Sequence, residues 1–217
     1  VECLAECTTN GFTTLDIVET SLGDTVTSGT DTSGTAWSDI NDVVLFGGFW
    51  GGGAEFEADA TDTVKGNAVQ TRLYPSATDT LNWARESTES LVAATMTTYV
   101  VEWGSNWTVQ HVNVSGSNVG DGCDATGEYN TGAITSVVRN NTWVWGTGYA
   151  TTNGIGDSFS GALITLGDGV AQNTNETLVG FCGEYASTKS ADIYAMTHAS
   201  LAVDYKFKVD GNVNDTD

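Results

Sequence analysis

The sequence predicts an all-β protein of the β-sandwich or jelly-roll class. Short runs of β-branched and aromatic residues recur along the chain, and 26 glycines but only one proline lie among them. Helix signals are scarce, because the best candidate, TLNWARESTESLVAATM at residues 80–96, lacks a 3.6-residue apolar period. A chain of 217 residues is long enough for one large all-β domain or two smaller ones.

The expected strands are segments rich in β-branched and aromatic residues that lie between turns. Glycine, Asn and Asp form those turns, as in GSN at 104–106 and GDG at 167–169. In chain order, strands are expected at residues 12–18, 42–49, 54–60, 67–74, 80–84, 91–103, 107–115, 133–139, 142–149, 158–166, 177–185, 191–198 and 202–209.

The stretch TYVVEWGSNWTVQHVNVSG at residues 98–116 predicts a β-hairpin. Tyr99, Val101 and Trp103 alternate on one face of its first strand, and the short GSN turn suits a hairpin connection. Trp103 and Trp107 are expected to pair where the two strands close. A bulge or change of face is expected near His111 in the second strand.

A weak internal repeat predicts two related β halves, at residues 37–118 and 119–217. FGGFWGGGAEFEA (46–58) resembles NTWVWGTGYATT (141–152), and TTYVVEW (97–103) is matched with ASLAVDYKFKV (199–209). A single-domain jelly roll is the alternative. Residues 1–36 differ from both halves, because TSLGDTVTSGTDTSGTAWSD (20–39) is polar and has no core pattern. They are expected to form an extended N-terminal arm or a surface loop.

The charge balance excludes several classes of partner. There are 28 acidic and 7 basic residues, a formal net charge of -21, and such a field repels nucleic acid and anionic lipid. No apolar run approaches the length of a membrane span, so membrane insertion is not expected. Because salt screens the self-repulsion of an acidic surface, we interpret the charge as adaptation to saline surroundings. A merely acidic secreted protein is the alternative.

The four cysteines predict disulfides in an oxidising, extracellular setting. Their spacing fits no compact zinc pattern. We expect the arm to be stapled to the body, with Cys3 and Cys7 each bonded to Cys123 or Cys182. Two alternatives stay open: a local Cys3–Cys7 bridge with Cys123–Cys182, and free buried thiols.

Few residues favour catalysis or metal binding. His111 and His198 are the only histidines, and we interpret them as ordinary strand residues rather than metal ligands. Glu55 and Glu57 share a strand face, and Glu102 lies beside a tryptophan, yet 28 acidic residues produce such pairs by composition alone. The acidic turns DGCD (121–124) and GDG (167–169) are read as plain turns, with calcium as the alternative. We therefore expect no catalytic activity, no resident metal and no cofactor.

Two further sets of residues are candidates for surface chemistry. The chain has five N-glycosylation sequons, which matter only in a host that glycosylates. The sequon asparagines are Asn106, Asn113, Asn140, Asn175 and Asn214. Most of the seven tryptophans are expected in the core, because each buries a large apolar area. In a sugar-binding protein the stacking residues would be Trp50, Trp103 and Trp107.

The segment NAVQTRLYPSATDTLNWARE followed by LVAATMTTYVVEWGSNWTVQHVNVSG resembles a β-rich module of structural proteins from tailed phages and archaeal viruses. The features that carry the resemblance are VVEW at 100–103, a tight turn, and VQ at 109–110. NTWVWGTGYATTNGIGDSFSGALITLGDGV and ASLAVDYKF look like a second, more diverged copy. The resemblance covers residues 40–210 and includes neither the arm nor its cysteines.

The resemblance implies a capsid-decoration, head-fibre or tail-fibre protein at a virion surface. The expected function is therefore structural: the protein assembles through its sheet faces and its arm with copies of itself or with other virion or surface proteins. Two alternatives are a carbohydrate-binding adhesin of cell-surface glycans and a secreted filament or surface-layer subunit. A glycan hydrolase is a more distant one.

Overall fold

The structure is a computed structural model that describes residues 11–23, 25–51, 71–85, 93–116, 130–152, 162–167, 173–183 and 186–203. These ranges are dominated by β-strands, so the all-β prediction is confirmed. No helix within them has the length and apolar character needed to cross a membrane. The strands are β1 (Phe12–Leu22), β2 (Ser28–Thr32), β3 (Val43–Gly51), β4 (Thr71–Pro75), β5 (Thr80–Arg85), β6 (Ala94–Trp103), β7 (Thr108–Gly116), β8 (Asn130–Val138), β9 (Thr142–Thr152), β10 (Ala162–Leu166), β11 (Asn175–Gly183) and β12 (Ala186–Thr197).

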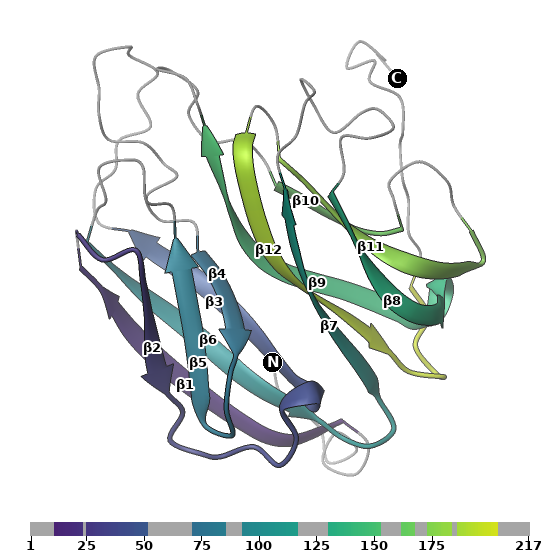
Figure 1. Ribbon diagram of the computed structural model, residues 1–217. Helices are drawn as coiled ribbons and strands as arrows, with labels where there is room; N and C mark the ends of the chain where they lie inside the picture. Colours follow the sequence, from purple (N-terminus) through teal and green to yellow (C-terminus); the bar gives the residue numbers. More distant parts are fainter. Residues whose placement is uncertain are drawn as a thin grey trace, which may run out of the picture.

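The strands form four three-stranded sheets whose pairings are all antiparallel. Sheet A has the order β1-β6-β3 and sheet B the order β2-β5-β4; they face each other as the first sandwich. Sheet C (β7-β12-β9) and sheet D (β10-β11-β8) form the second sandwich in the same way. Figure 1 shows the two sandwiches side by side, with β3 and β4 of the first nearest to β12 and β9 of the second.

The two sandwiches have the same topology. In each, the first, last and third strands form one sheet, and the second, fifth and fourth form the other. A short 3-10 turn precedes the third strand in both: η1 (Ile40–Asp42) before β3 and η3 (Arg139–Asn141) before β9. A glycine of the third strand faces an aliphatic side chain of the fourth in both, Gly47 against Leu73 and Gly146 against Ile164. The expected relation between two β halves is therefore present at the level of topology.

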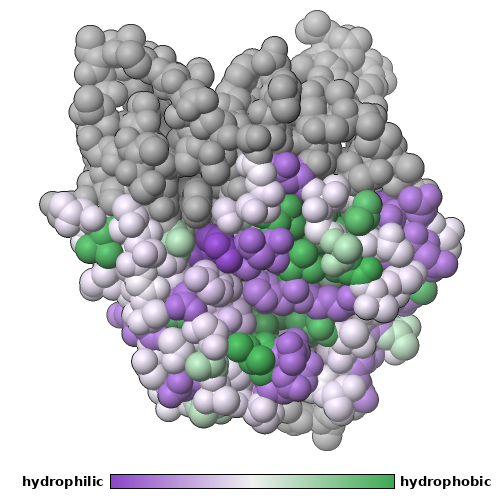
Figure 2. All heavy atoms as spheres, in the orientation of Figure 1, coloured by the Kyte–Doolittle hydropathy of each residue, from purple (hydrophilic) through white to green (hydrophobic). Residues whose placement is uncertain are grey.

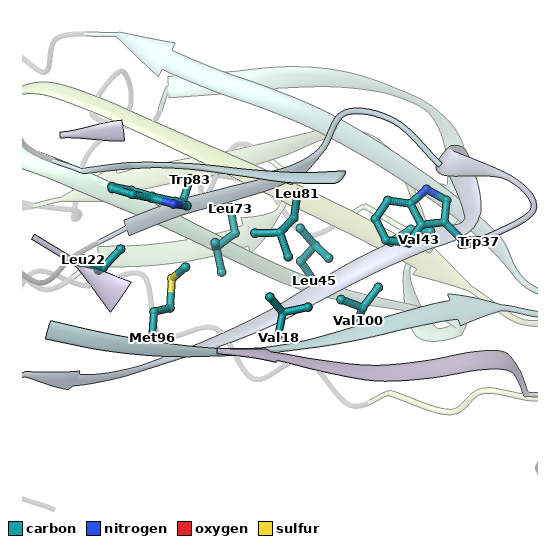
Figure 3. Packing of buried hydrophobic residues seen from close by; sticks show 10 residues of the cluster. All are labelled: Val18, Leu22, Trp37, Val43, Leu45, Leu73, Leu81, Trp83, Met96 and Val100. Atoms are coloured by element: carbon teal, nitrogen blue, oxygen red, sulfur yellow. The ribbon is translucent and has the colours of Figure 1, made fainter. Parts of the chain in front are cut away.

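The core of the first sandwich follows from strand alternation. Val43 and Leu45 of β3 point into it, and sheet B supplies Leu73, Leu81 and Trp83. Figure 3 shows these side chains of the two sheets directed toward one another. Full burial of a side chain such as Leu81 stabilises the fold by about 1.5–3 kcal/mol relative to exposure.

The core of the second sandwich is built by the same rule. Ala191, Ile193 and Ala195 of β12 alternate toward sheet D, and Phe181 of β11 fills the space opposite them. The intervening residues of β12 point the other way, toward the first sandwich, where Tyr194 and Met196 join a third apolar cluster. The central strand β12 is thus buried on both faces.

Residues 1–36 were predicted to form an arm or a surface loop, with one strand at 12–18, and the structure corrects the arm for residues 12–32. Within them, β1 pairs with β6 along its length, and β2 pairs with β5. The segment was misread because β2 (SGTDT) is polar, yet an edge strand is held by backbone hydrogen bonds and needs no apolar face. Residues 1–10 lie outside the described residues.

The predicted hairpin at 98–116 is also wrong. Strand β6 lies between β1 and β3, so both of its edges are taken, and β7 pairs with β12 instead. The turn at 104–107 therefore joins two sandwiches, and the boundary between the halves lies there rather than at 118/119. The register between β7 and β12 is continuous, so no bulge lies near His111.

The repeat was aligned correctly at one strand and wrongly at another. Residues 46–51 and 142–152 lie in equivalent strands, β3 and β9. TTYVVEW lies in β6, whose equivalent is β12 at 186–197, not the segment 199–209. Of the strands expected at 54–60 and 202–209, the first lies outside the described residues, and residues 202–203 of the second are not strand.

Candidate functional site

The candidate site is the interface between the sandwiches, where two strand edges of the first lie on the outward face of sheet C. Strand β4 is an edge strand, and at Leu73 its free backbone groups are satisfied by Thr147 of β9. The Thr147 hydroxyl accepts from Leu73 N at 2.8 Å and donates to Leu73 O at 3.3 Å. Trp145 Nε1 donates to Leu45 O of β3 at 3.1 Å. Side chains of sheet C thus replace the strand that these edges lack.

Aromatic rings fill the rest of the interface. Phe46 of β3 stacks on Trp143 with ring centroids 5.7 Å apart, and its ring lies 5.4 Å from that of Trp145. At the other end, Trp107 lies in the connection between the sandwiches. Its ring centroid is 4.4 Å from that of Trp103 and 4.8 Å from that of His198. The expected Trp103–Trp107 contact is therefore present, although no hairpin makes it.

A buried charged group lies in the same interface. Asp192 of β12 is fully buried, and its two carboxylate oxygens have different partners. Oδ2 accepts from Arg72 Nε of β4, and Oδ1 is 2.6 Å from His111 Nε2 of β7. Arg72 also lies over the ring of Tyr74, 4.4 Å from its centroid. Asp192 therefore joins one strand of the first sandwich to two strands of the second.

Tyr194 completes this cluster. Its ring stacks on His111 with centroids 4.8 Å apart and an interplanar angle of 16°. Its hydroxyl donates to Leu73 O at 3.4 Å. Burial, and next the negative charge of Asp192, raise the pKa of the Tyr194 hydroxyl well above its ordinary value of 10.0, so it stays a neutral donor.

The contacts of Asp192, Arg72, His111 and Tyr194 hold the two sandwiches together, and we call this group the clamp. An Asp–His pair is also part of hydrolase triads, but here Asp192 shares its charge with Arg72 and the imidazole of His111 lies flat on Tyr194. Sequence reasoning missed Asp192 and Arg72 because they are 120 residues apart and no local pattern relates them. The one available signal was an aspartate inside an otherwise apolar strand, ADIYAM.

The clamp borders an exposed apolar row on the outward face of sheet A. Ile17 of β1 and Phe46 of β3 are both register partners of Tyr99 of β6. Ile17 is 56% exposed, Tyr99 46% and Trp143 37%. The row Ile17–Tyr99–Phe46 thus runs from solvent to the stacked Trp143 at the interface.

A cluster of acidic residues lies at η1. The Glu102 carboxylate is buried, and its Oε1 accepts from Ser38 N, Ser38 Oγ and Asp39 N. Burial of Asp42, and then the charges of Asp39 and Glu102, raise the pKa of the Asp42 carboxyl. Glu102 thus ties the segment before β3 to β6.

The buried pair Arg139–Glu176 fixes the turn after β10. Arg139 Nη2 donates to Glu176 Oε1 at 2.6 Å and to Leu166 O at 3.3 Å. Gly167 has a φ of 100°, a conformation that favours glycine, and it begins the GDG turn. Residues 168 and 169 of that turn lie outside the described residues, as does the whole of DGCD. Within the described ranges, no group of three or more His, Cys, Asp or Glu could hold a metal ion.

The two histidines do not form a joint site. His111 is the register partner of Tyr194, and His198 follows Tyr194 by four residues, about 13 Å along an extended strand. Glu55 and Glu57 lie outside the described residues, as do Cys3, Cys7 and Cys123. Cys182 lies in β11 as the register partner of Leu163, and the disulfides stay a prediction.

The structure separates the candidate tryptophans and sequons by their surroundings. Trp103 is 8% exposed and Trp107 is partly buried, so both belong to the interface between the sandwiches. Trp50 lies in β3. Asn106 lies exposed in the turn between β6 and β7, and Asn113, also exposed, donates to Ala191 O within sheet C at 3.2 Å. Asn140 and Asn175 are exposed, and Asn214 lies outside the described residues.

The described residues seen in Figure 2 are mostly hydrophilic or of intermediate hydropathy. Figure 2 shows one face, on which apolar side chains form small separate groups among hydrophilic ones. A surface of this kind suits a chain of net charge -21. No family model, no curated protein and no solved structure matches this chain.

Proposed function

We propose that this chain is a non-enzymatic structural protein of an extracellular or virion surface, which assembles with copies of itself in saline surroundings. The observation that carries the proposal is the interface between the sandwiches. The chain already contains one β-module docked on another through strand edges, aromatic rings and a buried charge. A module that packs in this way is suited to repeated contacts in an array.

The acidic surface supports the saline setting. Copies with a net charge of -21 repel each other at low ionic strength, and salt screens this repulsion. The resemblance to virion proteins supports placing the array on a virus particle. A secreted filament or surface-layer subunit would use the same contacts.

Assembly is tested by light scattering on purified protein over about 0.1 to 3 M NaCl. We expect the molar mass to rise with salt and with protein concentration. A protein that stays monomeric throughout would overturn both the virion and the filament form of the proposal. The genes beside this one separate the two forms, since terminase and portal genes nearby support the virion and their absence supports the filament.

A carbohydrate-binding adhesin is the second candidate, favoured by the exposed rings of Tyr99 and Trp143. Exposed aromatic faces can stack on sugar rings. A glycan array tests this function with the wild type and Trp143→Ala. Binding that is lost in the variant supports the adhesin, and an array without binding removes it.

A further inference from the structure

We propose that the chain polymerises head to tail: the β9–β10 edge of one copy docks on the Ile17–Tyr99–Phe46 row of the next copy. This inference deepens the proposed function and rests on it, because it names the surface through which copies assemble. The interface between the two sandwiches of one chain is the precedent for this contact.

The interface between the sandwiches shows, first, which face of one sandwich is covered by another. Tyr99 and Tyr194 occupy equivalent positions, because each is the register partner of the equivalent third-strand aromatic, Phe46 or Trp145. Tyr194 is fully buried under the first sandwich, whereas Tyr99 is 46% exposed. The same face of the module is therefore covered in the second sandwich and partly open in the first.

The same interface also shows which edge of a sandwich lies on that face. The first sandwich covers Tyr194 with the edge formed by its third and fourth strands, β3 and β4. The equivalent edge of the second sandwich is formed by β9 and β10. Each is the last strand of its sheet, and β10 pairs with β11 alone among the described strands. Within the chain, the β3–β4 edge lies on the outward face of sheet C; we call these the used edge and the used face. The equivalent β9–β10 edge and the outward face of sheet A are the further edge and the further face.

The further face lacks the His111–Asp192 contact of the used face. Where the used face has His111 and Asp192, the further face has Ile17 and Thr97 at the equivalent register positions. The contact between a histidine and a buried aspartate is therefore absent from this face, and exposed Glu19 of β1, the register partner of Thr97, stands where the used face has Asn113. An edge that docks here must therefore bring no arginine that needs a buried aspartate.

The further edge meets that requirement. Leu73 and Ile164 are equivalent, since each faces the equivalent glycine of the third strand. The residue before Leu73 is Arg72, which binds Asp192. The residue before Ile164 is Leu163, so the edge lacks the arginine just as the face lacks the aspartate. The arginine and the aspartate are thus absent together, so this edge and this face leave no half of that ion pair unpartnered.

The row is also continuous with the interface already formed, because Phe46 lies both in the row and against Trp143 and Trp145. Two different surfaces meet in the proposed contact, so it does not close on itself as a symmetric dimer would. Each added copy presents a new face and a new edge. The product is an open chain whose growth is opposed by acidic repulsion and assisted by salt.

The test compares single substitutions on the row with a matched one elsewhere. Ile17→Glu and Tyr99→Glu place a charge on the row, and Val138→Glu places one at a 45% exposed position on β8, the far edge of sheet D. We expect wild type and Val138→Glu to associate alike in high salt. The row variants should need at least about tenfold more protein to associate, a loss of about 1.4 kcal/mol.

A mixing experiment tests the head-to-tail arrangement. Tyr99→Glu retains its edge, so a small fraction of it should cap growing wild-type chains and lower the mean molar mass. If the row variants associate like the wild type, the row is not the contact, although the proposed assembly stands. Wild-type association that stops at a dimer overturns the open chain, and a monomer in all salts overturns both proposals.

Folding of the variants is checked by thermal unfolding. Exposed positions such as Ile17 and Tyr99 tolerate polar residues, so the midpoints should match that of the wild type. If a glutamate variant unfolds, Ile17→Thr and Tyr99→Ser replace it in the same comparison. Association unchanged in these folded variants would overturn the proposed row.

Discussion

Tyr99 and Tyr194 occupy the same position in two sandwiches of identical topology, and one is half exposed while the other is completely buried. Both lie on the central strand of their sheet, opposite an aromatic residue of the neighbouring strand. Their difference in burial comes from the packing of the first sandwich on the second. A comparison of the two positions therefore shows how much that packing contributes to the free energy of unfolding.

Substitution of the two tyrosines should lower the free energy of unfolding by different amounts, because only Tyr194 is packed against the other sandwich. Tyr194→Ala removes a buried ring and its contact with His111, and should lower the free energy of unfolding by about 3–5 kcal/mol. Tyr99→Ala should lower it by less than about 1 kcal/mol. Urea unfolding at one fixed salt concentration gives both values. Similar losses at the two positions would mean that the interface contributes little.

Removal of the buried charge should weaken the clamp. Asp192→Asn keeps the shape but leaves Arg72 and His111 without their anion, and should cost about 2–4 kcal/mol. Glu19→Gln, an exposed change of the same charge, is the control and should be close to neutral. Equal stabilities of the two variants would contradict the assigned role of Asp192.

Asp42 should make the fold slightly less stable at neutral pH. Its pKa is raised in the folded state, so the folded form binds the proton more tightly than the unfolded form. This contribution to stability is present below pH 3.8, the ordinary pKa of an aspartate, and is lost as the pH rises through the folded pKa.

Asp42→Asn should therefore raise the free energy of unfolding at pH 7, by at most about 1 kcal/mol after solvent screening. The gain should disappear below pH 3.8 and shrink in high salt. Urea unfolding at pH 3, 5 and 7 checks the trend, with Glu19→Gln measured in parallel. A gain that grew toward low pH would have the wrong sign.

The two equivalent glycines should respond differently to a methyl group. At Gly146 a Cβ would lie 2.7 Å from Ile164 Cδ1 and 2.8 Å from the backbone oxygen of Asp192, which cannot move alone. At Gly47 the nearest atom is the terminal methyl of Leu73, which can rotate.

Gly146→Ala should therefore cost about 1–3 kcal/mol, and Gly47→Ala should cost less. Urea midpoints of the two variants give the comparison. The reverse order would mean that the buried Leu73 side chain cannot rotate to make room for the methyl group.

Strand positions could be predicted because alternation is local, whereas strand partners could not. VVLF at 43–46 and ADIYAM at 191–196 identify strands from their residues alone. Nothing in TYVVEWGSNWTV shows that β1 and β3 already occupy both edges of β6, so a short turn was read as a hairpin.

The site was harder to predict than the strands for the same reason. Asp192 has its partners 81 and 120 residues away, and only the packing of two sandwiches joins them. Without its partners, an aspartate in an apolar strand looks like an isolated exception. The polar strand β2 was overlooked because it carries no apolar pattern, and its backbone pairing with β5 lies some fifty residues away in sequence.

The turn at 104–107 gives the two sandwiches a property that separate copies lack. Trp107 N donates to Gly104 O at 2.9 Å, so the connection is short and tightly turned. A short tether holds its two ends at an effective concentration of about millimolar or more. The internal contact therefore forms however dilute the protein is, while the same kind of contact between copies depends on crowding. A densely populated surface would supply that crowding, and a dilute solution would not.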